Sequence, residues 1–231
     1  MAALVSMRSA KRDVHGVLLL DKPAGLSSNQ ALVRAKRLFH AKKAGHTGTL
    51  DPFATGLLPI CFGEATKFSQ DLLEADKTYE AVVHLGIRTT TGDTEGERID
   101  GPKPVSFSSG EIETVLSRFR GTILQIPPMY SALKRDGKPF YDYARAGIEL
   151  EREARPVTIH RLALVEFSSP FLTLAVTCSK GTYIRSLAHD LGKVCGSGSH
   201  LSALRRTRVG DFRVEDGFKM DEIIGVLQEN L

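Results

Sequence analysis

The spacing of hydrophobic and polar residues along the chain predicts a mixture of strands and helices. Continuous apolar runs at residues 17–20 and 57–62 are typical of short buried strands. Residues 77–85 alternate between apolar and polar side chains, which predicts a strand with one buried face. Patterns of the same kinds predict further strands over residues 121–126, 157–167, 171–178 and 209–214.

Helices are predicted where apolar residues recur every three or four positions. The first follows Ser27, and we expect Ser28 to cap it, because a serine hydroxyl accepts a hydrogen bond from the first turn. Its apolar positions continue to Phe39 and leave Arg34 and Arg37 facing water. Later helices are predicted over residues 64–73, 109–119 with Ser109 as the cap, 183–194 and 221–229.

The order of these elements favours one α+β domain with appendages, because strands and helices follow one another irregularly and no internal repeat is present. One appendage is predicted at residues 127–155, where a Pro-Pro break is followed by aromatic residues interleaved with Lys and Arg. This composition is typical of a segment that orders against RNA, since cations track phosphates and rings stack on bases. An ordinary long surface loop is the alternative interpretation.

The composition excludes several classes of protein. With 231 residues, 42% of them hydrophobic and 25% charged, the chain is neither collagen-like nor intrinsically disordered. Its three cysteines, Cys61, Cys178 and Cys195, lie too far apart to suggest a disulfide framework or a zinc site, which favours a reducing compartment. Because no apolar run has the length of a signal peptide or a membrane span, we expect a cytoplasmic protein with no membrane partner.

The formal net charge of +4 conceals an uneven distribution of charge along the chain. Residues 1–50 contain nine Lys or Arg and two Asp, whereas residues 51–100 contain four Lys or Arg and ten Asp or Glu. A concentration of cations is typical of proteins that bind a polyanion. The pattern therefore predicts a basic face formed by the first part of the chain, and it favours a polyanionic partner.

The stretch from Gly45 to Gly56 contains the strongest candidate for catalysis. Its sequence is GHTGTLDPFATG, in which Asp51 precedes a proline. Proline biases the residue before it to an extended conformation, and glycine lets the backbone approach a partner closely. Asp51 can therefore be presented on a rigid, exposed loop, although an isolated Asp-Pro pair is more often an ordinary turn.

The same stretch closely resembles the catalytic signature of the tRNA pseudouridine synthases of the TruB family. The resemblance extends over most of residues 15–210, and its motifs follow the order that the family has. It rests on five further strings, namely DKPAG at 21–25, GEATK at 63–67, DKTY at 76–79, IPPMYSALK at 126–134 and CSKGTYIR at 178–185. The strings that contain Asp51 and Arg185 are highly specific, whereas DKPAG is weak by itself.

The resemblance implies an RNA-modifying isomerase that converts uridine to pseudouridine. This reaction breaks the N1–C1′ bond, rotates the base and joins C5 to C1′ without net oxidation, so no cofactor is required. The resemblance makes Asp51 the nucleophile, Arg185 the partner that keeps it ionised, and Tyr79 the ring that stacks on the target base. On spacing alone, a turn aspartate, a solvated arginine and a core tyrosine are the ordinary interpretations. Attack by the carboxylate at C6 of the base and at C1′ of the ribose are both open.

Further site residues follow from the same resemblance. His46 matches a histidine that occupies space in the RNA loop and supports the flipped base, and no metal is expected. Tyr183 and Leu204 match positions that line the uracil pocket, whereas Lys22 and Lys67 are expected to contact the RNA backbone or neighbouring carboxylates. The residues expected to contact phosphates are Arg34, Arg37, Lys134 and Arg145.

The fold implied by the resemblance is the pseudouridine synthase fold, a mixed and mostly antiparallel central sheet flanked by helices and loops. We expect one catalytic domain over residues 1–231, with residues 127–155 as a thumb-like RNA-binding insertion and without the PUA-type C-terminal domain that family members usually carry. The expected substrate is the T-loop uridine at tRNA position 55, modified by a monomer without guide RNA. Two alternatives are an RNA-binding or tRNA-folding protein whose catalysis is secondary or lost, and a guide-RNA-dependent synthase of the archaeal and eukaryotic type.

Overall fold

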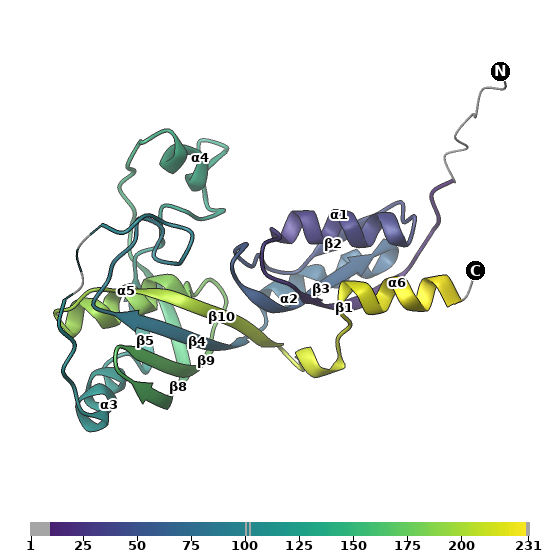
Figure 1. Cartoon of the computed structure of the whole chain (residues 1–231). Helices are drawn as coiled ribbons and strands as arrows, with labels where there is room; N and C mark the ends of the chain where they lie inside the picture. The colour runs from purple at the N-terminus through teal and green to yellow at the C-terminus, as the bar shows by residue number, and fades with distance from the viewer. Residues whose placement is uncertain (1–9, 100, 102, 230–231) are drawn as a thin grey trace, which may run out of the picture.

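The structure is a computed structural model, and it describes residues 10–99, 101 and 103–229. Its centre is a twisted sheet of nine strands within these residues (Figure 1). All pairings in this sheet are antiparallel except that of β3 with β10, which is parallel, so the predicted mixed and mostly antiparallel sheet is confirmed. Along its main path the strands are β1 (Gly16–Lys22), β3 (Thr55–Phe62), β10 (Ser199–Val209), β4 (Lys77–Leu85), β9 (Phe171–Cys178), β8 (Arg155–Ser168) and β5 (Gly121–Gln125). β2 (Ala44–His46) and β11 (Phe212–Arg213) pair with β3 and β10 respectively.

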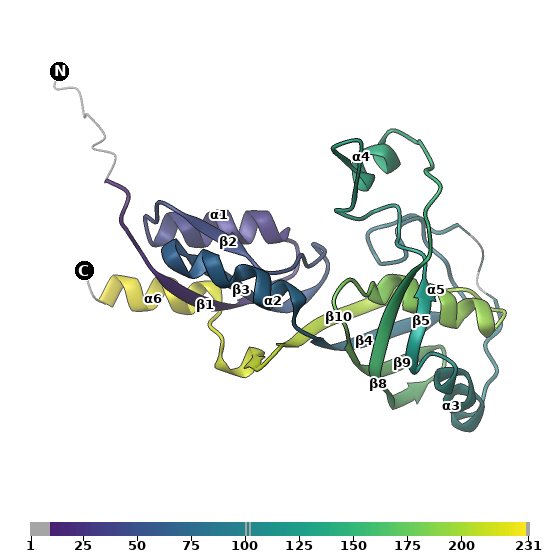
Figure 2. The same cartoon turned by 180° about the vertical axis from the view of Figure 1, so that it is seen from behind.

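The sheet spans two halves of the molecule, and β10 passes from one half into the other (Figures 1 and 2). In one half, α1 (Ser28–Leu38) and α6 (Met220–Glu229) pack apolar side chains against β1 and β3. In the other half, α5 (Ile184–Val194) and α3 (Ser109–Ser117) contribute to a larger core with β4, β8 and β9. The joint between the halves is therefore the place where β10 pairs with β3 on one side and with β4 on the other.

The predicted strands at residues 17–20, 57–62, 77–85, 121–126, 157–167 and 171–178 are present, with ends that differ by no more than two residues. The predicted last strand at 209–214 is wrong. The strand is β10, which ends at Val209, and only the short β11 and the 3-10 helix η2 (Val214–Asp216) follow it. The polar, arginine-rich segment 199–209 lacks a continuous apolar run, yet tertiary partners for its polar groups allow it to lie inside the sheet.

Two predicted helix caps are each displaced by one residue. Ser27 rather than Ser28 caps α1, since its hydroxyl accepts from the Gln30 amide while the Gln30 side chain accepts from the Ser27 amide. Ser108 rather than Ser109 makes the same reciprocal pair at α3. Ser28 instead points inward, where its hydroxyl accepts from the Leu50 amide and donates to the Leu50 carbonyl. The start of α1 is thus tied to the loop that carries Asp51.

The other predicted helices are present with small changes. The predicted helix over 64–73 divides into a 3-10 helix, η1 (Gly63–Phe68), and α2 (Ser69–Glu74). The fourth and fifth predicted helices correspond to α5 and α6, which begin at Ile184 and Met220. No helix within the described part of the chain is both long and apolar enough to cross a membrane.

Residues 127–155 extend away from the body of the molecule (Figures 1 and 2). They contain a small hairpin of β6 (Lys134–Arg135) and β7 (Lys138–Pro139), followed by α4 (Phe140–Arg145). Two of their cations lie against rings of the same segment: the Lys138 ammonium is 4.8 Å from the Tyr143 ring centre, and the Arg145 guanidinium carbon is 5.3 Å from that of Tyr141. The predicted insertion is therefore a structured projection that keeps basic and aromatic groups together.

Candidate active site

The loop between β2 and β3 holds Asp51 at the joint between the two halves. The Ala54 amide donates to the Asp51 carbonyl over 3.1 Å, which closes a turn after Asp51. The Gly25 amide donates to the Pro52 carbonyl over 2.8 Å, so the turn after β1 supports the same loop. Together with the two hydrogen bonds between Ser28 and Leu50, these contacts fix the backbone on both sides of the carboxylate.

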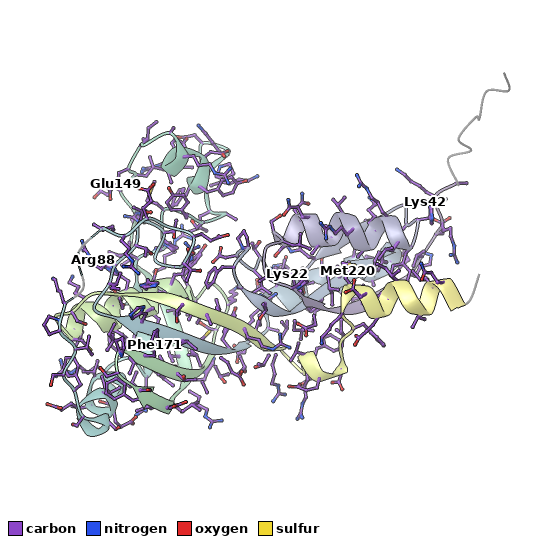
Figure 3. The ribbon with its side chains drawn as sticks, viewed as in Figure 1. Lys22, Lys42, Arg88, Glu149, Phe171 and Met220 are labelled. Atoms are coloured by element: carbon purple, nitrogen blue, oxygen red, sulfur yellow. The ribbon has the colours of Figure 1, made fainter. Side chains whose placement is uncertain are left out.

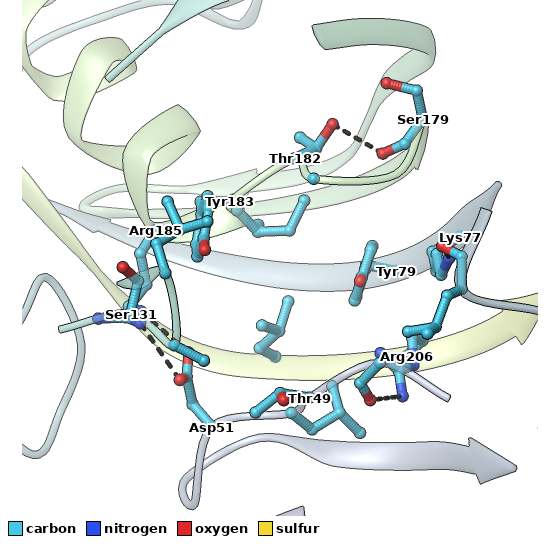
Figure 4. Close-up of a pocket in the computed structure, with 18 residues that line it drawn as sticks. Thr49, Asp51, Lys77, Tyr79, Ser131, Ser179, Thr182, Tyr183, Arg185 and Arg206 are labelled. Carbon is cyan, nitrogen blue, oxygen red and sulfur yellow. Dashed lines mark hydrogen bonds and ion pairs between the residues drawn. The ribbon is translucent and has the colours of Figure 1, made fainter. Parts of the chain in front are cut away.

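Arg185, in the first turn of α5, binds the Asp51 carboxylate through one ion-pair contact and one hydrogen bond (Figure 4). Its Nε lies 2.9 Å from Oδ2 and its Nη2 lies 3.2 Å from Oδ1. The guanidinium is buried and also donates to the carbonyls of Thr91 and Tyr130, at 3.0 and 2.6 Å. A second carboxylate, that of Asp93, lies 3.7 Å from Nε. The planar guanidinium therefore holds Asp51 in one orientation.

The charge of Asp51 is set by opposing effects on its pKa. Burial raises the pKa of the carboxyl above its ordinary value, the neighbouring charge of Arg185 lowers it, and the charge of Asp93 raises it. Removing the carboxylate from water alone would favour the neutral acid. The bidentate contact with Arg185 is what favours the ionised form inside this site.

Asp51 and Arg185 open onto a cavity of about 330 Å³, which also contains the side chains of Tyr79, Tyr183 and Leu204 (Figure 4). Tyr79 comes from β4, Leu204 from β10 and Tyr183 from the residue before α5. Burial raises the pKa of both phenols above its ordinary value near 10, so both rings are neutral at pH 7. Beside its charged groups, the cavity has apolar and aromatic walls, which suit a flat, neutral base.

The structure therefore brings together five of the residues singled out from the sequence, and it leaves the others outside this cavity. His46 lies in β2 and is half-buried, and burial lowers the pKa of its imidazole. Lys67 is exposed in η1 and pairs with Glu64, the neighbouring carboxylate on the same turn.

Lys22 is not placed for contact with RNA. Its side chain is fully buried at the end of β1, where the two halves meet (Figure 3). The ammonium donates to the carbonyls of Pro23, Leu26 and Pro52, at 2.9, 2.7 and 3.4 Å. Burial lowers the pKa of Lys22 to about 8, and the negative charge of the neighbouring Asp51 acts in the opposite direction. Lys22 thus supports the loop after Asp51 from behind, because a cation without water needs carbonyl partners.

The residues predicted to contact phosphates lie on the surface in two groups. Arg34 and Arg37 are exposed on α1, and Lys134 and Arg145 are exposed on the insertion. α1 and α4 both lie along the upper side of the molecule in Figures 1 and 2. Exposed cations are therefore present on two separate parts of the fold, α1 and the insertion.

Two buried cations that line the cavity were not found from the sequence. Arg206 is fully buried in β10, where Nε donates to the Leu57 carbonyl over 2.8 Å and Nη2 to the Gly48 carbonyl over 3.1 Å. Its charge also acts on the Tyr79 phenol, against the effect of burial on the pKa. Lys77, beside it, donates to the carbonyls of Leu72, Leu73 and Ala75, and burial lowers its pKa to about 8. Nothing in the sequence distinguishes Arg206 from its half-exposed neighbour Arg205, because both occur in one polar run.

No group of three or more His, Cys, Asp or Glu side chains within the described residues is arranged to hold a metal ion. The ionisable side chains that line the cavity are the Asp51 carboxylate, the phenols of Tyr79 and Tyr183, and the cations of Lys77, Arg185 and Arg206.

Comparison with models of known protein families shows which family the chain belongs to. Residues 36–184 match the TruB family pseudouridylate synthase N-terminal domain, and residues 185–230 match the tRNA pseudouridylate synthase B C-terminal domain. The chain belongs to the TruB family. The boundary between the two TruB matches falls immediately before Arg185, so Asp51 and its partner arginine belong to different matched segments.

TruB relatives and solved structures agree with this membership. The chain is 62% identical over 222 residues to tRNA pseudouridine synthase B of Burkholderia mallei, a match that covers 96% of this chain and 71% of that protein. It is 63% identical over 218 residues to the protein of that name from Cupriavidus metallidurans, covering 94% and 69%. Among solved structures, a chain of the Cbf5-Nop10-Gar1 complex matches with a TM-score of 0.71 and 33% identity. That match covers 90% of this chain and 53% of the solved chain, so this chain spans about half the length of the solved one.

Proposed function

We propose that this chain converts a uridine of tRNA to pseudouridine, and that the uridine is the one at position 55 in the T-loop. The observation that carries the proposal is the bidentate ion pair of Arg185 with Asp51 at the wall of a cavity lined by two tyrosines. Relatives of this chain that are about 62% identical bear the name tRNA pseudouridine synthase B. The T-loop position rests on the motifs that surround Asp51 and Arg185.

Different residues of the cavity act in different steps of the isomerisation. The Asp51 carboxylate is the nucleophile that allows the N1–C1′ bond to break, and Arg185 keeps it ionised and oriented. The detached uracil rotates while Tyr79 and Leu204 hold it in the cavity, and C5 then bonds to C1′. The bond between Asp51 and the nucleotide breaks, the proton on C5 leaves last, and N1 takes up a proton, so the product has the composition of the substrate. No electron donor or acceptor takes part.

RNA reaches this cavity only when the target base leaves its stack, since a paired or stacked base cannot enter an enclosed site. The exposed cations of α1 and of the insertion are suited to the phosphates on either side of that base. We therefore assign residues 127–155 as an RNA-binding thumb on a single catalytic body. The proposed enzyme acts as a monomer and without guide RNA.

An RNA-binding or tRNA-folding protein without catalysis is the second candidate. Surface cations and stacking rings would serve that function equally well. A partly buried carboxylate held by a buried arginine would not, because desolvating these charges costs stability and a carboxylate adds no affinity for a polyanion. The arrangement at Asp51 therefore favours the enzyme.

The test is to incubate the protein with an unmodified T-arm stem-loop transcript, without guide RNA or cofactor, and to map pseudouridine in the product. We expect pseudouridine at the position that corresponds to 55. Asp51→Asn should abolish product formation while the affinity for the transcript changes little, because the amide keeps the shape of the carboxylate but is not a nucleophile. Asp71→Asn, on the exposed face of α2, is the matched control and should behave as the wild type.

Turnover near the wild-type rate in Asp51→Asn would contradict the role of this carboxylate. Product at a different uridine would contradict the T-loop assignment. Tight binding of the transcript by the wild type without any pseudouridine would instead support the RNA-folding candidate.

A further inference from the structure

The start of α5 carries two residues of the cavity but contains no side-chain cap of its own. Tyr183 occupies the cap position in an extended conformation and makes no capping hydrogen bond with its side chain. Helix starts leave several backbone amides without partners, so a distant group must satisfy them. At Tyr183 that group is the side chain of Gln125, from the end of β5.

Gln125 holds the backbone of Tyr183 from both sides of the residue. The Tyr183 amide donates to Oε1 of Gln125 over 2.7 Å, and Nε2 of Gln125 donates to the Tyr183 carbonyl over 3.1 Å. The Gln125 side chain is buried, with 2% of the residue exposed. Only an amide accepts one hydrogen bond and donates another in this geometry at every ordinary pH.

The segment that follows Gln125 runs along the same helix turn. The Ser186 hydroxyl donates to the Ile126 carbonyl over 2.8 Å, and Nη2 of Arg185 donates to the Tyr130 carbonyl over 2.6 Å. That Nη2 is the atom that also binds Oδ1 of Asp51. The segment 125–130 and the start of α5 are therefore joined at three nearby residues, Tyr183, Arg185 and Ser186.

We propose that Gln125 is a positioning residue for the reaction, which acts through Tyr183 and Arg185 and does not itself touch the substrate. This inference rests on the proposed isomerase function. A shift of about 1 Å in a catalytic group can lower a rate by about 100-fold. Because Tyr183 is the cap residue of α5, the pair of hydrogen bonds from Gln125, here called the clamp, sets the position of the phenol in the cavity wall and of the guanidinium two residues later.

Two substitutions at Gln125 test the clamp against a general packing role. Gln125→Met keeps the volume but removes both hydrogen bonds, and we expect the single-turnover rate to fall by about 10- to 100-fold with little change in tRNA affinity. Gln125→Glu keeps the shape of the side chain, but its hydrogen bonds to Tyr183 become dependent on pH. The neutral acid accepts from the Tyr183 amide and donates to its carbonyl, whereas the carboxylate can only accept and repels the carbonyl oxygen.

The expected signature is recovery of Gln125→Glu at low pH. Burial raises the pKa of a carboxyl, so the ratio of its rate to the wild-type rate should rise as the pH falls from about 8 to about 5.5. The ratio for Gln125→Met should stay constant over the same range. Gln30→Glu is the matched control, since it adds the same charge at the exposed capping box of α1, and its ratio should also stay constant.

A constant ratio for Gln125→Glu, or a wild-type rate in Gln125→Met, would overturn the inference while leaving the proposed function intact. Absence of pseudouridine with the wild-type protein would instead contradict the proposed function. Amide hydrogen exchange of a peptide containing Tyr183 supplies a readout that does not depend on activity. The clamp predicts faster exchange in Gln125→Met than in the wild type at pH 7, and equal exchange would contradict it.

Discussion

Asp51 shows how a single ionisable residue obtains its properties from side chains distant in sequence. Its carboxylate is partly buried, and it lies within hydrogen-bond distance of Arg185, which is 134 residues away. Burial and the nearby Asp93 raise its pKa, while Arg185 lowers it. A group that must be ionised to react becomes less active as the pH falls through its pKa. The acid limb of the pH profile therefore reports on this balance.

Arg185→Met should move that acid limb to higher pH. Burial and Asp93 still raise the pKa of Asp51 in this variant, and the opposing cation is gone, so the limb should shift upward by about 1–3 pH units. The measurement is the single-turnover rate of pseudouridine formation between about pH 5 and 9. Arg205→Met is the control, because Arg205 pairs with Asp21 outside the cavity and should leave the limb in place. An unchanged limb in Arg185→Met would show that another group ionises there.

At the scale of elements, β10 is the strand that joins the two halves, and its parallel contact with β3 is short. Arg205 pairs with Thr55 and Arg206 with Gly56 in this register. Gly56 has a φ of +102°, and a Cβ at this position would lie 2.2 Å from the Arg206 carbonyl oxygen. The glycine of the catalytic signature is thus required by the close approach of two strands at the joint.

Gly56→Ala should therefore destabilise the protein strongly. The new methyl group meets backbone atoms that cannot move aside and sits at a φ unfavourable for alanine, so we expect the free energy of unfolding to fall by about 2–4 kcal/mol. Denaturant titration followed by circular dichroism measures the change. Gly110→Ala is the matched control, since Gly110 lies in α3 with open space around its Cβ position, and it should stabilise by about 0.5–1 kcal/mol. Similar effects of the two substitutions would contradict the steric argument.

For the whole molecule, the exposed cations are spread over a surface that is larger than the cavity, which suits a large polyanionic partner. The exposed cations of α1 and of the insertion belong to different parts of the fold, and both lie along its upper side (Figure 1). The cations at the cavity are buried and bonded to backbone carbonyls or to Asp51, whereas those of α1 and the insertion are exposed. Affinity for RNA should therefore come from these surfaces, and the chemical step from the joint between the halves.

Replacing Lys134 and Arg145 together with Gln should weaken tRNA binding and its dependence on salt. Binding releases fewer counterions from the tRNA when phosphate contacts are lost. The slope of log affinity against log salt concentration should therefore decrease in magnitude by about 1–2. Fluorescence titration of labelled tRNA at several salt concentrations measures the slope, and the single-turnover rate at saturation should stay unchanged. Arg118→Gln, at the end of α3 on the opposite side of the molecule, is the control. An unchanged slope would exclude the insertion from the RNA contact.

Much of the fold and of the site could be predicted from local patterns. The alternation of residues 77–85 predicts β4 and places Tyr79 on its buried face, because side chains on a strand alternate between two sides. Asp51 and Arg185 could be named because each lies in a long string typical of one family. The capping serines were displaced by a single residue, since adjacent serines at a helix start are equivalent by sequence.

The sequence by itself therefore determined the class of fold, the elements with a clear period and the identity of five of the residues that meet at the cavity. Only the tertiary structure decided which polar groups are buried there. Arg206, Lys22 and Gln125 belong to local patterns that suggest solvent exposure or carry no signal, and the backbone carbonyls or amides that satisfy each of them when buried include groups from distant segments. The physical reason is that the cost of burying a polar group depends on partners brought by the fold, and those partners are not neighbours in sequence.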